Sequence, residues 1–129
     1  GVNLSRANLC QAILFETDFR SSSEQQTDLG YADLSNADLS YANLSGVLLH
    51  GANLKGAKLC RAILEVWGID NSYQTDLSEA NLQAADLSYA NLTGVNLKKA
   101  DLRGADLTRT ILTNANLQGA IMPDGTIHD

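Results

Sequence analysis

The stretch Ala32-Asp33-Leu34-Ser35-Asn36-Ala37-Asp38-Leu39-Ser40-Tyr41-Ala42-Asn43-Leu44 decides the fold, because its leucines recur every five residues. Each leucine has Ala two residues before it and Asp or Asn between the two. A short fixed period is typical of repeat proteins, in which one structural unit stacks on the next. The rest of the chain is therefore interpreted from this period outward.

A period of five excludes a long helix and a long flat strand. Five residues of α-helix turn by about 500°, so the leucines would form no apolar stripe. In a flat strand, residues five apart point to opposite faces. The period fits a strand of two or three residues followed by a bend, so that each pentapeptide turns one corner. With corners of about 90°, four pentapeptides close one coil, and coils stack about 4.8 Å apart.

Each position of the pentapeptide then has a predicted direction. Leu fills the axis of the solenoid, and the small residue two before it also faces inward, where a larger side chain would overpack. Asp and Asn face outward and accept hydrogen bonds from the backbone of the bend. The predicted core consists of the central leucines of the regular blocks: Leu29, Leu34, Leu39, Leu44, Leu49, Leu54, Leu59, Leu64, Leu77, Leu82, Leu87, Leu92, Leu97, Leu102, Leu107 and Leu112.

The motif resembles that of the pentapeptide-repeat family, A(D/N)LXX. This resemblance implies an all-β fold, the right-handed quadrilateral parallel β-helix, also called the repeat-five-residue fold. For a chain of this length it implies about six coils, with loop interruptions. The handedness and the square cross-section rest on the resemblance, because the five-residue period alone does not fix the rotation at each corner.

The chain is expected to form one domain over residues 1–129. Regular blocks cover 27–64 and 75–112, and irregular connectors near 20–26 and 65–74 interrupt the period. At an offset of 48 residues the two blocks are identical at 24 of 38 positions, which indicates a tandem duplication.

Residues 121–129 leave the motif. Their Pro123-Asp124-Gly125 sequence predicts a tight turn in a tail that ends or caps the last coil. Glycines such as Gly46 and Gly51 fall at bend positions, where we expect them to supply backbone freedom.

Isoleucine replaces the usual polar residue at three outward positions, Ile13, Ile63 and Ile111. We expect the connectors to fold back over Ile13 and Ile63, with Trp67 packed near Ile63; the alternative is a scatter of exposed apolar residues. Trp67 and Tyr73, the aromatic residues of the second connector, are the candidate interaction residues.

The sequence predicts no catalytic, cofactor-binding or metal-binding residues. Catalysis needs convergent groups in a concave site, and a prism filled with Leu offers none. His50 and His128 lack an evident catalytic partner, and outward aspartates are expected to form a solvated face. Cys10 and Cys60 are expected at least two coils apart, too far for a disulfide, and therefore free thiols in a reducing compartment.

Charge and hydropathy narrow the expected location and partners. The chain has no run of 18 apolar residues, so no membrane span is expected. It shows no basic segment followed by an apolar one, as a leader would have, so a cytoplasmic protein is the default expectation. The net charge of −6 disfavours direct binding to nucleic acid.

Two functions are open at this point. The first is a non-catalytic module for interaction with an unidentified protein partner, present as a monomer or an end-to-end dimer. The alternative comes from the resemblance, since some pentapeptide-repeat proteins look like duplex DNA in shape and charge and inhibit DNA gyrase. A DNA mimic should present a continuous negative stripe. Here, Lys55, Lys58 and Arg61 interrupt the acidic residues.

Overall fold

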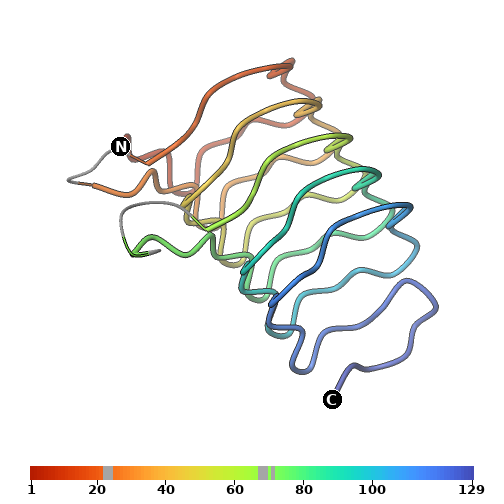
Figure 1. Cartoon of the computed structure of the whole chain (residues 1–129). Coiled ribbons are helices and arrows are strands. Elements are labelled where there is room, and N and C mark those ends of the chain that lie inside the picture. Colours follow the sequence, from red (N-terminus) through yellow and green to blue (C-terminus); the bar gives the residue numbers. More distant parts are fainter. Residues whose placement is uncertain (22–24, 67–69, 71) are drawn as a thin grey trace.

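The structure, a computed structural model, describes residues 1–21, 25–66, 70 and 72–129. The chain winds around one axis as a stack of coils that advances steadily from the N-terminus to the C-terminus (Figure 1). Among the described residues there is no α-helix and no continuous strand, and single-residue parallel bridges join the coils. The hydrogen bonds around one bridge span three residues, because the Leu48 N–H donates to the Thr27 carbonyl (2.9 Å) and the Leu29 N–H to the Leu48 carbonyl (2.7 Å), in agreement with the predicted strand of two or three residues.

The bridges lie at the middle position of the motif and fix the register of the coils. Most join residues 20 apart, such as Asp28 with Leu48, so four pentapeptides make one turn of the chain. We name the four sides A to D by their bridge residues in the second coil, which are Asp28, Asp33, Asp38 and Asn43 in this order. The corner that follows each side takes the same letter.

The bridge residues also number the coils: coil 1 covers 3–18, coil 2 28–43, coil 3 48–63, coil 4 76–91 and coil 5 96–111, and the bridges at 116 and 121 continue the stack. Equivalent residues lie 25 apart between coils 1 and 2, and 28 apart between coils 3 and 4. The two connectors thus lengthen the chain between coils without changing which sides stack.

Apart from corner D of coils 1 and 3, where the connectors begin, the corners are tight turns with a left-handed residue. In the corner after Leu34, the Ala37 N–H donates to the Leu34 carbonyl (3.1 Å), and Asn36 between them has φ of 57°. A positive φ at this place is the pattern of a type II turn. Gly46 and Gly51 have positive φ at equivalent places, as expected, but many corners keep a side chain there.

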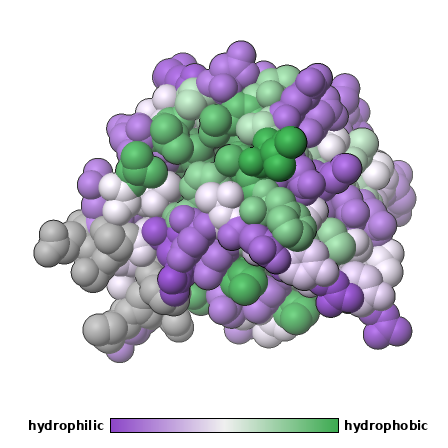
Figure 2. All heavy atoms as spheres, turned by 90° about the horizontal axis from the view of Figure 1, so that it is seen from above, coloured by the Kyte–Doolittle hydropathy of each residue, from purple (hydrophilic) through white to green (hydrophobic). Residues whose placement is uncertain are grey.

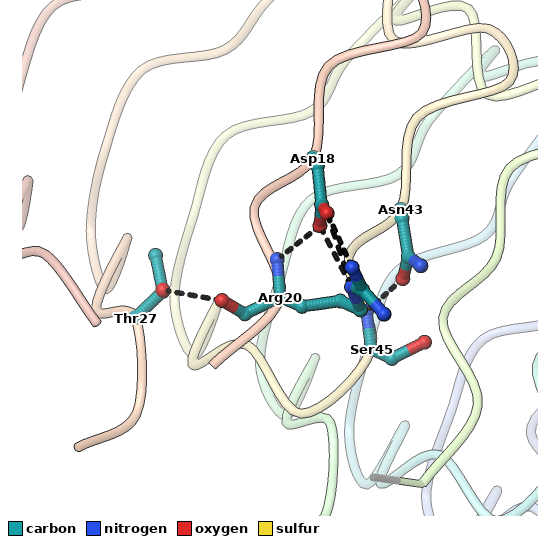
Figure 3. Close-up of polar contacts among 5 residues, drawn as sticks. All are labelled: Asp18, Arg20, Thr27, Asn43 and Ser45. Atoms are coloured by element: carbon teal, nitrogen blue, oxygen red, sulfur yellow. Dashed lines mark hydrogen bonds and ion pairs between the residues drawn. The ribbon is translucent and has the colours of Figure 1, made fainter. Parts of the chain in front are cut away.

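Asp and Asn at the middle position hold the corner from outside. The Ser35 N–H donates to Asp33 Oδ1 (3.0 Å), and the Ser45 N–H donates to Asn43 Oδ1 (3.1 Å; Figure 3). The predicted outward direction and hydrogen bonding of these residues are confirmed. The motif favours Asp or Asn because a short side-chain acceptor reaches the N–H two residues further on.

The core is a column of leucines that is deepest in the middle of the stack. The predicted core leucines from Leu29 to Leu102 are at most 1% exposed, whereas Leu107 and Leu112 are half-buried. The central residues of coil 1, such as Leu14 and Phe19, are also half-buried and pack against the core. Among the described residues, every buried side-chain nitrogen or oxygen has a hydrogen-bond partner.

Both connectors leave the stack at corner D, and polar side chains tie their ends. Thr75 is fully buried, donates to the Glu65 carbonyl (3.1 Å) and accepts from the Gly46 N–H (2.7 Å). Gln26 Nε2 donates to the Gly46 carbonyl, and Gln74 Nε2 makes the equivalent bond to Gly94, both at 3.0 Å. The duplication therefore repeats the anchoring of the connectors as well as the core.

The predicted cover over the outward isoleucines is wrong for Ile13, whose side chain is 86% exposed. The first connector starts at corner D, whereas Ile13 lies on side C. Ile63 is 37% exposed. The expected packing of Trp67 near Ile63 lies outside the described residues.

The tail forms a hairpin, as its turn sequence predicted. Ile121 pairs with Ile127 in an antiparallel bridge, and the Met122 N–H donates to the Thr126 carbonyl (2.7 Å). The His128 N–H donates to the Ala120 carbonyl (2.8 Å). The hairpin covers only part of the end of the stack, because Leu117 stays half-buried.

Candidate interaction surface

One shallow hollow of about 450 Å³ lies along side A and is lined by Tyr31, Leu48, His50, Gly51, Asp76, Ser78 and Glu79. Tyr31 and His50 touch edge to face, with ring centroids 5.1 Å apart. A Cβ on Gly51 would lie within 2.4 Å of the Tyr31 ring, so the glycine makes room for that ring. The hollow is open to solvent, whereas catalysis requires a water-poor site.

The described residues offer no metal or disulfide chemistry. No group of three His, Cys, Asp or Glu side chains among them could hold a metal ion. Cys10 and Cys60 are free and stand on different sides of the solenoid, in coils 1 and 3. The part of the chain that the structure describes also contains no helix with the length and apolarity that a membrane crossing requires.

Acidic and basic groups are mixed on the surface. Arg20 pairs with Asp18 at 2.7 Å (Figure 3), and Arg103 pairs with Asp101 at 2.6 Å. In both pairs, hydrogen bonds from the guanidinium hold the pKa of the carboxyl below its ordinary value. Lys58 stands in the same column as Asp38, at the bridge on side C. These faces do not form the continuous negative stripe that a DNA mimic requires.

Exposed apolar and aromatic side chains concentrate around corner C. Of the large apolar residues that are exposed, Ile13, Phe15, Tyr41, Ile63, Tyr89 and Ile111 lie on side C, at corner C or on side D. At corner B the left-handed positions of coils 1 to 5 hold Gln11, Asn36, Gly56, Ala84 and Gly104. Seen from above, apolar residues gather in one area with hydrophilic residues around it (Figure 2).

We call Tyr41, Arg61, Ile63, Tyr89, Arg109 and Ile111 the C–D edge. Its corner residues stack in successive coils, because the Tyr41 N–H donates to Cys60, the Arg61 N–H to Ser88 and the Tyr89 N–H to Thr108 of the next coil. The Arg61 guanidinium lies over the Tyr89 ring at 4.5 Å from its centroid. The Phe15 ring contacts Tyr41 edge to face at 5.5 Å.

The C–D edge has the composition of a protein-binding surface. Tyr and Arg are the residues that most often carry binding energy at interfaces, and a rigid backbone lowers the entropy cost of binding. Tyr41 is 50% exposed and Tyr89 45%. The edge thus presents aromatic, apolar and cationic groups on a backbone fixed by hydrogen bonds between coils.

The interaction residues predicted from the sequence, Trp67 and Tyr73, belong to the second connector. Tyr73 is half-buried, and Trp67 lies outside the described residues. The five-residue pattern does not predict the C–D edge, because the number of connector residues that count toward a coil decides which corners stack. One signal was available: Tyr41 and Tyr89, Arg61 and Arg109, and Ile63 and Ile111 are each 48 residues apart.

The chain matches the family model for pentapeptide repeats, in eight copies, over residues 27–65, 75–114 and 90–124. No curated protein sequence matches it. Among solved structures it is similar to HetL, a pentapeptide repeat protein involved in heterocyst differentiation regulation from the cyanobacterium Nostoc sp. strain PCC 7120. The identity is 58% and the TM-score 0.94, over 98% of this chain and 53% of HetL. The chain thus spans about half the length of HetL.

Two further structures are similar. Rfr23, a pentapeptide repeat protein from the cyanobacterium Cyanothece 51142, is 33% identical with a TM-score of 0.71, over 100% of this chain and 86% of Rfr23. A pentapeptide repeat protein from the thylakoid lumen of Arabidopsis thaliana is 35% identical with a TM-score of 0.66, over 79% of this chain and 66% of its own. The fluoroquinolone resistance protein QnrB1, at 20% identity and a TM-score of 0.50, shares the fold alone.

Proposed function

Because the chain belongs to the pentapeptide-repeat family, we propose that it is a non-catalytic module that binds another protein in a regulatory process. HetL is involved in the regulation of heterocyst differentiation, and the 58% identity supports a regulatory role here. A common fold alone names no function, so the proposal rests on a surface of this chain.

The observation that carries the proposal is the C–D edge. Single exposed apolar residues are ordinary on a protein surface, but a row of them along one edge marks an interaction site. Arg61 over Tyr89 and Phe15 against Tyr41 hold the exposed side chains of this row in contact with one another. A partner therefore meets side chains that are already ordered.

Inhibition of DNA gyrase by mimicry of DNA is the second candidate, and the charge pattern argues against it. Duplex DNA carries phosphates at regular intervals along both strands. On the solenoid, Arg20 and Arg103 neutralise neighbouring aspartates, and Lys58 interrupts the acidic column of side C. The likeness to QnrB1 carries no information about function at 20% identity.

The finer expectations from the sequence are part of the same proposal. A right-handed helix with four sides is supported by the family and by the four columns of bridges. We also propose a cytoplasmic location, a monomer or end-to-end dimer, and a contribution of Trp67 and Tyr73 to partner binding beside the C–D edge. The experiment that follows tests the last of these, the contribution of the second connector.

The test is an affinity capture from native cell extract with four baits. The wild type is compared with Tyr41→Gly/Tyr89→Gly, and with the matched control Asn36→Gly/Ala84→Gly, which changes the equivalent left-handed positions of corner B in the same coils. A fourth bait has residues 65–74 replaced by a plain loop. We expect a partner that the wild type and the corner B control retain and the tyrosine variant loses.

Capture that depends only on residues 65–74 would place the interaction in the connector. Capture of gyrase by all four baits would favour mimicry by the faces of the solenoid. If none of the baits retains a protein, the proposed interaction function is wrong.

A further inference from the structure

The two copies of the duplication are less similar in their outward residues than in their core residues. At the offset of 48 residues, inward Leu and Ala repeat because the core requires them. Outward residues on sides A and B mostly differ between the copies: Tyr31 corresponds to Glu79, His50 to Lys98 and Asn36 to Ala84. More of the outward residues repeat around corner C, although Lys58 corresponds to Asp106 and Cys60 to Thr108.

On the C–D edge both copies keep the same three exposed residues. Tyr41, Arg61 and Ile63 of coils 2 and 3 correspond to Tyr89, Arg109 and Ile111 of coils 4 and 5. Core packing does not explain this identity, because all six residues are exposed. We name each group of three a Tyr-Arg-Ile set.

The tyrosines and arginines of these sets have a left-handed backbone conformation, which is unfavourable for a residue with a side chain. Tyr41 and Tyr89 have φ of 61° and 59°, and Arg61 and Arg109 have φ of 59° and 54°. Glycine adopts this conformation without strain, and it occupies the equivalent position of corner B in Gly56 and Gly104. Side chains such as Asn36 and Ala84 occupy the same backbone conformation at other corners, so it is the identity of Tyr and Arg in both copies that points to a role outside the fold.

The arginines of the two sets are available to a partner. Neither Arg61 nor Arg109 takes part in the ion pairs of the described residues, which join Arg20 to Asp18 and Arg103 to Asp101. The acidic residues on side C of coils 4 and 5 are engaged locally: Asp86 accepts from the Ser88 N–H at 3.0 Å and from its hydroxyl at 2.6 Å, and Asp106 accepts from the Thr108 N–H at 2.9 Å. A carboxylate is the protein group that a free guanidinium binds best, through paired hydrogen bonds.

The distance between the two sets indicates which secondary structure of a partner fits them. The sets lie two coils apart, which is about 9.6 Å at the spacing of stacked strands. Residues seven apart on an α-helix share one face and are separated by about 10.5 Å along its axis. Residues on one face of an extended strand are about 6.8 or 13.6 Å apart, so neither spacing matches.

We propose that the C–D edge binds an amphipathic α-helix of a partner protein, which carries two carboxylate side chains seven residues apart beside apolar residues. The helix lies along the solenoid axis, with its carboxylates on Arg61 and Arg109 and its apolar residues on the tyrosines and isoleucines. This inference rests on the proposed function as an interaction module. The net charge of −6 opposes an acidic partner at long range, but salt screens exposed charges beyond about 10 Å.

The test uses three fluorescent peptides, each locked as a helix by a side-chain staple, and fluorescence anisotropy. The first carries two glutamates seven residues apart beside leucines, the second carries them four apart, and the third has lysines in place of the glutamates. We expect the wild-type chain to bind the first peptide at least about tenfold more tightly than the others.

Two double variants locate the binding site. We expect Arg61→Gly/Arg109→Gly to weaken binding of the first peptide at least about tenfold, because both guanidiniums are lost. Lys55→Gln/Arg103→Gln is the charge control, since it removes two positive charges at corner B in the same coils, each one residue before the position that corresponds to the arginine. This control should bind as the wild type does.

Equal affinity for the three peptides, no binding of the first peptide, or equal effects of the two variants would overturn the inference. The outcome is separable from that of the proposed function. If the affinity capture yields a partner that depends on Tyr41 and Tyr89 while the peptides show no preference, only the helical partner is wrong. If the capture yields none, the interaction function itself fails.

Discussion

Leu59 and Leu14 occupy the same position of the motif, on side C in coils 3 and 1, yet their surroundings differ. Leu59 is fully buried, whereas Leu14 is half-buried. Leu59 has a coil on either side of it, and Leu14 has a described coil on one side only. The comparison teaches that a leucine in this fold gains its burial from the next coils along the axis, in addition to its own.

The largest expected effect is the removal of a core leucine from the middle of the stack. Leu59→Ala should lower the free energy of unfolding by about 3 to 5 kcal/mol, because a closed cavity remains between coils 2 and 4. Leu14→Ala should cost about 1 to 2 kcal/mol, because less area is buried at this position. Urea unfolding measures both, and equal losses would show that the end coil is as well packed as the middle.

Enlarging the small inward residue should also destabilise the middle of the stack more than coil 1. Ala57→Leu in coil 3 should destabilise by about 1 to 3 kcal/mol, because Ala57 is fully buried beside the leucine column. Ala7→Leu in coil 1 should cost less, since Ala7 is half-buried and a larger side chain can lean toward solvent. Thermal unfolding of the two variants gives the order, and a larger loss for Ala7→Leu contradicts the comparison.

Replacing glycines at corners should show the same difference between the middle and the end of the stack, with a smaller loss of stability. Gly51→Ala places a methyl group about where the Tyr31 ring lies, at φ of 62°, so both strain and displacement of the ring contribute. Gly125→Ala in the tail has φ of 87° and nothing within 4 Å, so only the backbone strain of about 1 kcal/mol remains. Urea unfolding should show the larger loss for Gly51→Ala, and the reverse order would contradict the role of the neighbouring coil.

The smallest expected effect concerns the pH dependence of stability. Here an aspartate in the middle of the stack and one in the tail should behave alike. The Ser35 hydroxyl and N–H lower the pKa of Asp33 in coil 2, and the Thr126 hydroxyl and N–H lower the pKa of Asp124 in the tail. The ordinary value is 3.8 for both. A carboxyl group whose pKa is lowered in the folded state stabilises the fold at pH values above its ordinary pKa. This stability is lost as the pH falls through the folded pKa.

Titration of the two carboxyl groups by NMR spectroscopy should place both folded pKa values below 3.8. The two should shift in the same direction, because the hydrogen bonds that lower both pKa values come from a residue two positions further on; Asp33 Oδ1 also accepts from Asn53 Nδ2 of the next coil, at 3.4 Å. Asp33→Asn and Asp124→Asn keep a side-chain acceptor, so they should remove the acid dependence while the corner persists. An ordinary pKa at Asp33 would contradict the hydrogen bonds described for the corner.

Most of the fold could be predicted from single pentapeptides. The five-residue period predicted the inward leucines, the outward Asp and Asn and the glycine corners, and the Pro-Asp-Gly sequence at 123–125 predicted the turn of the tail. The period did not reveal that residues such as Tyr41 and Arg61 share the left-handed backbone of the glycines, because a corner forms with either residue and the motif leaves this position free.

The sequence by itself determined the direction of nearly every side chain, because direction depends on bonds within one pentapeptide and its corner. Only the tertiary structure decided which outward residues meet. The connector lengths set the stacking register, and that register places Arg61 over Tyr89 and leaves Ile13 uncovered. The motif of the single repeat predicts the core residues, whereas the C–D edge forms only when the coils stack. Its residues are up to 70 positions apart in the sequence and become neighbours through the pairing of the coils.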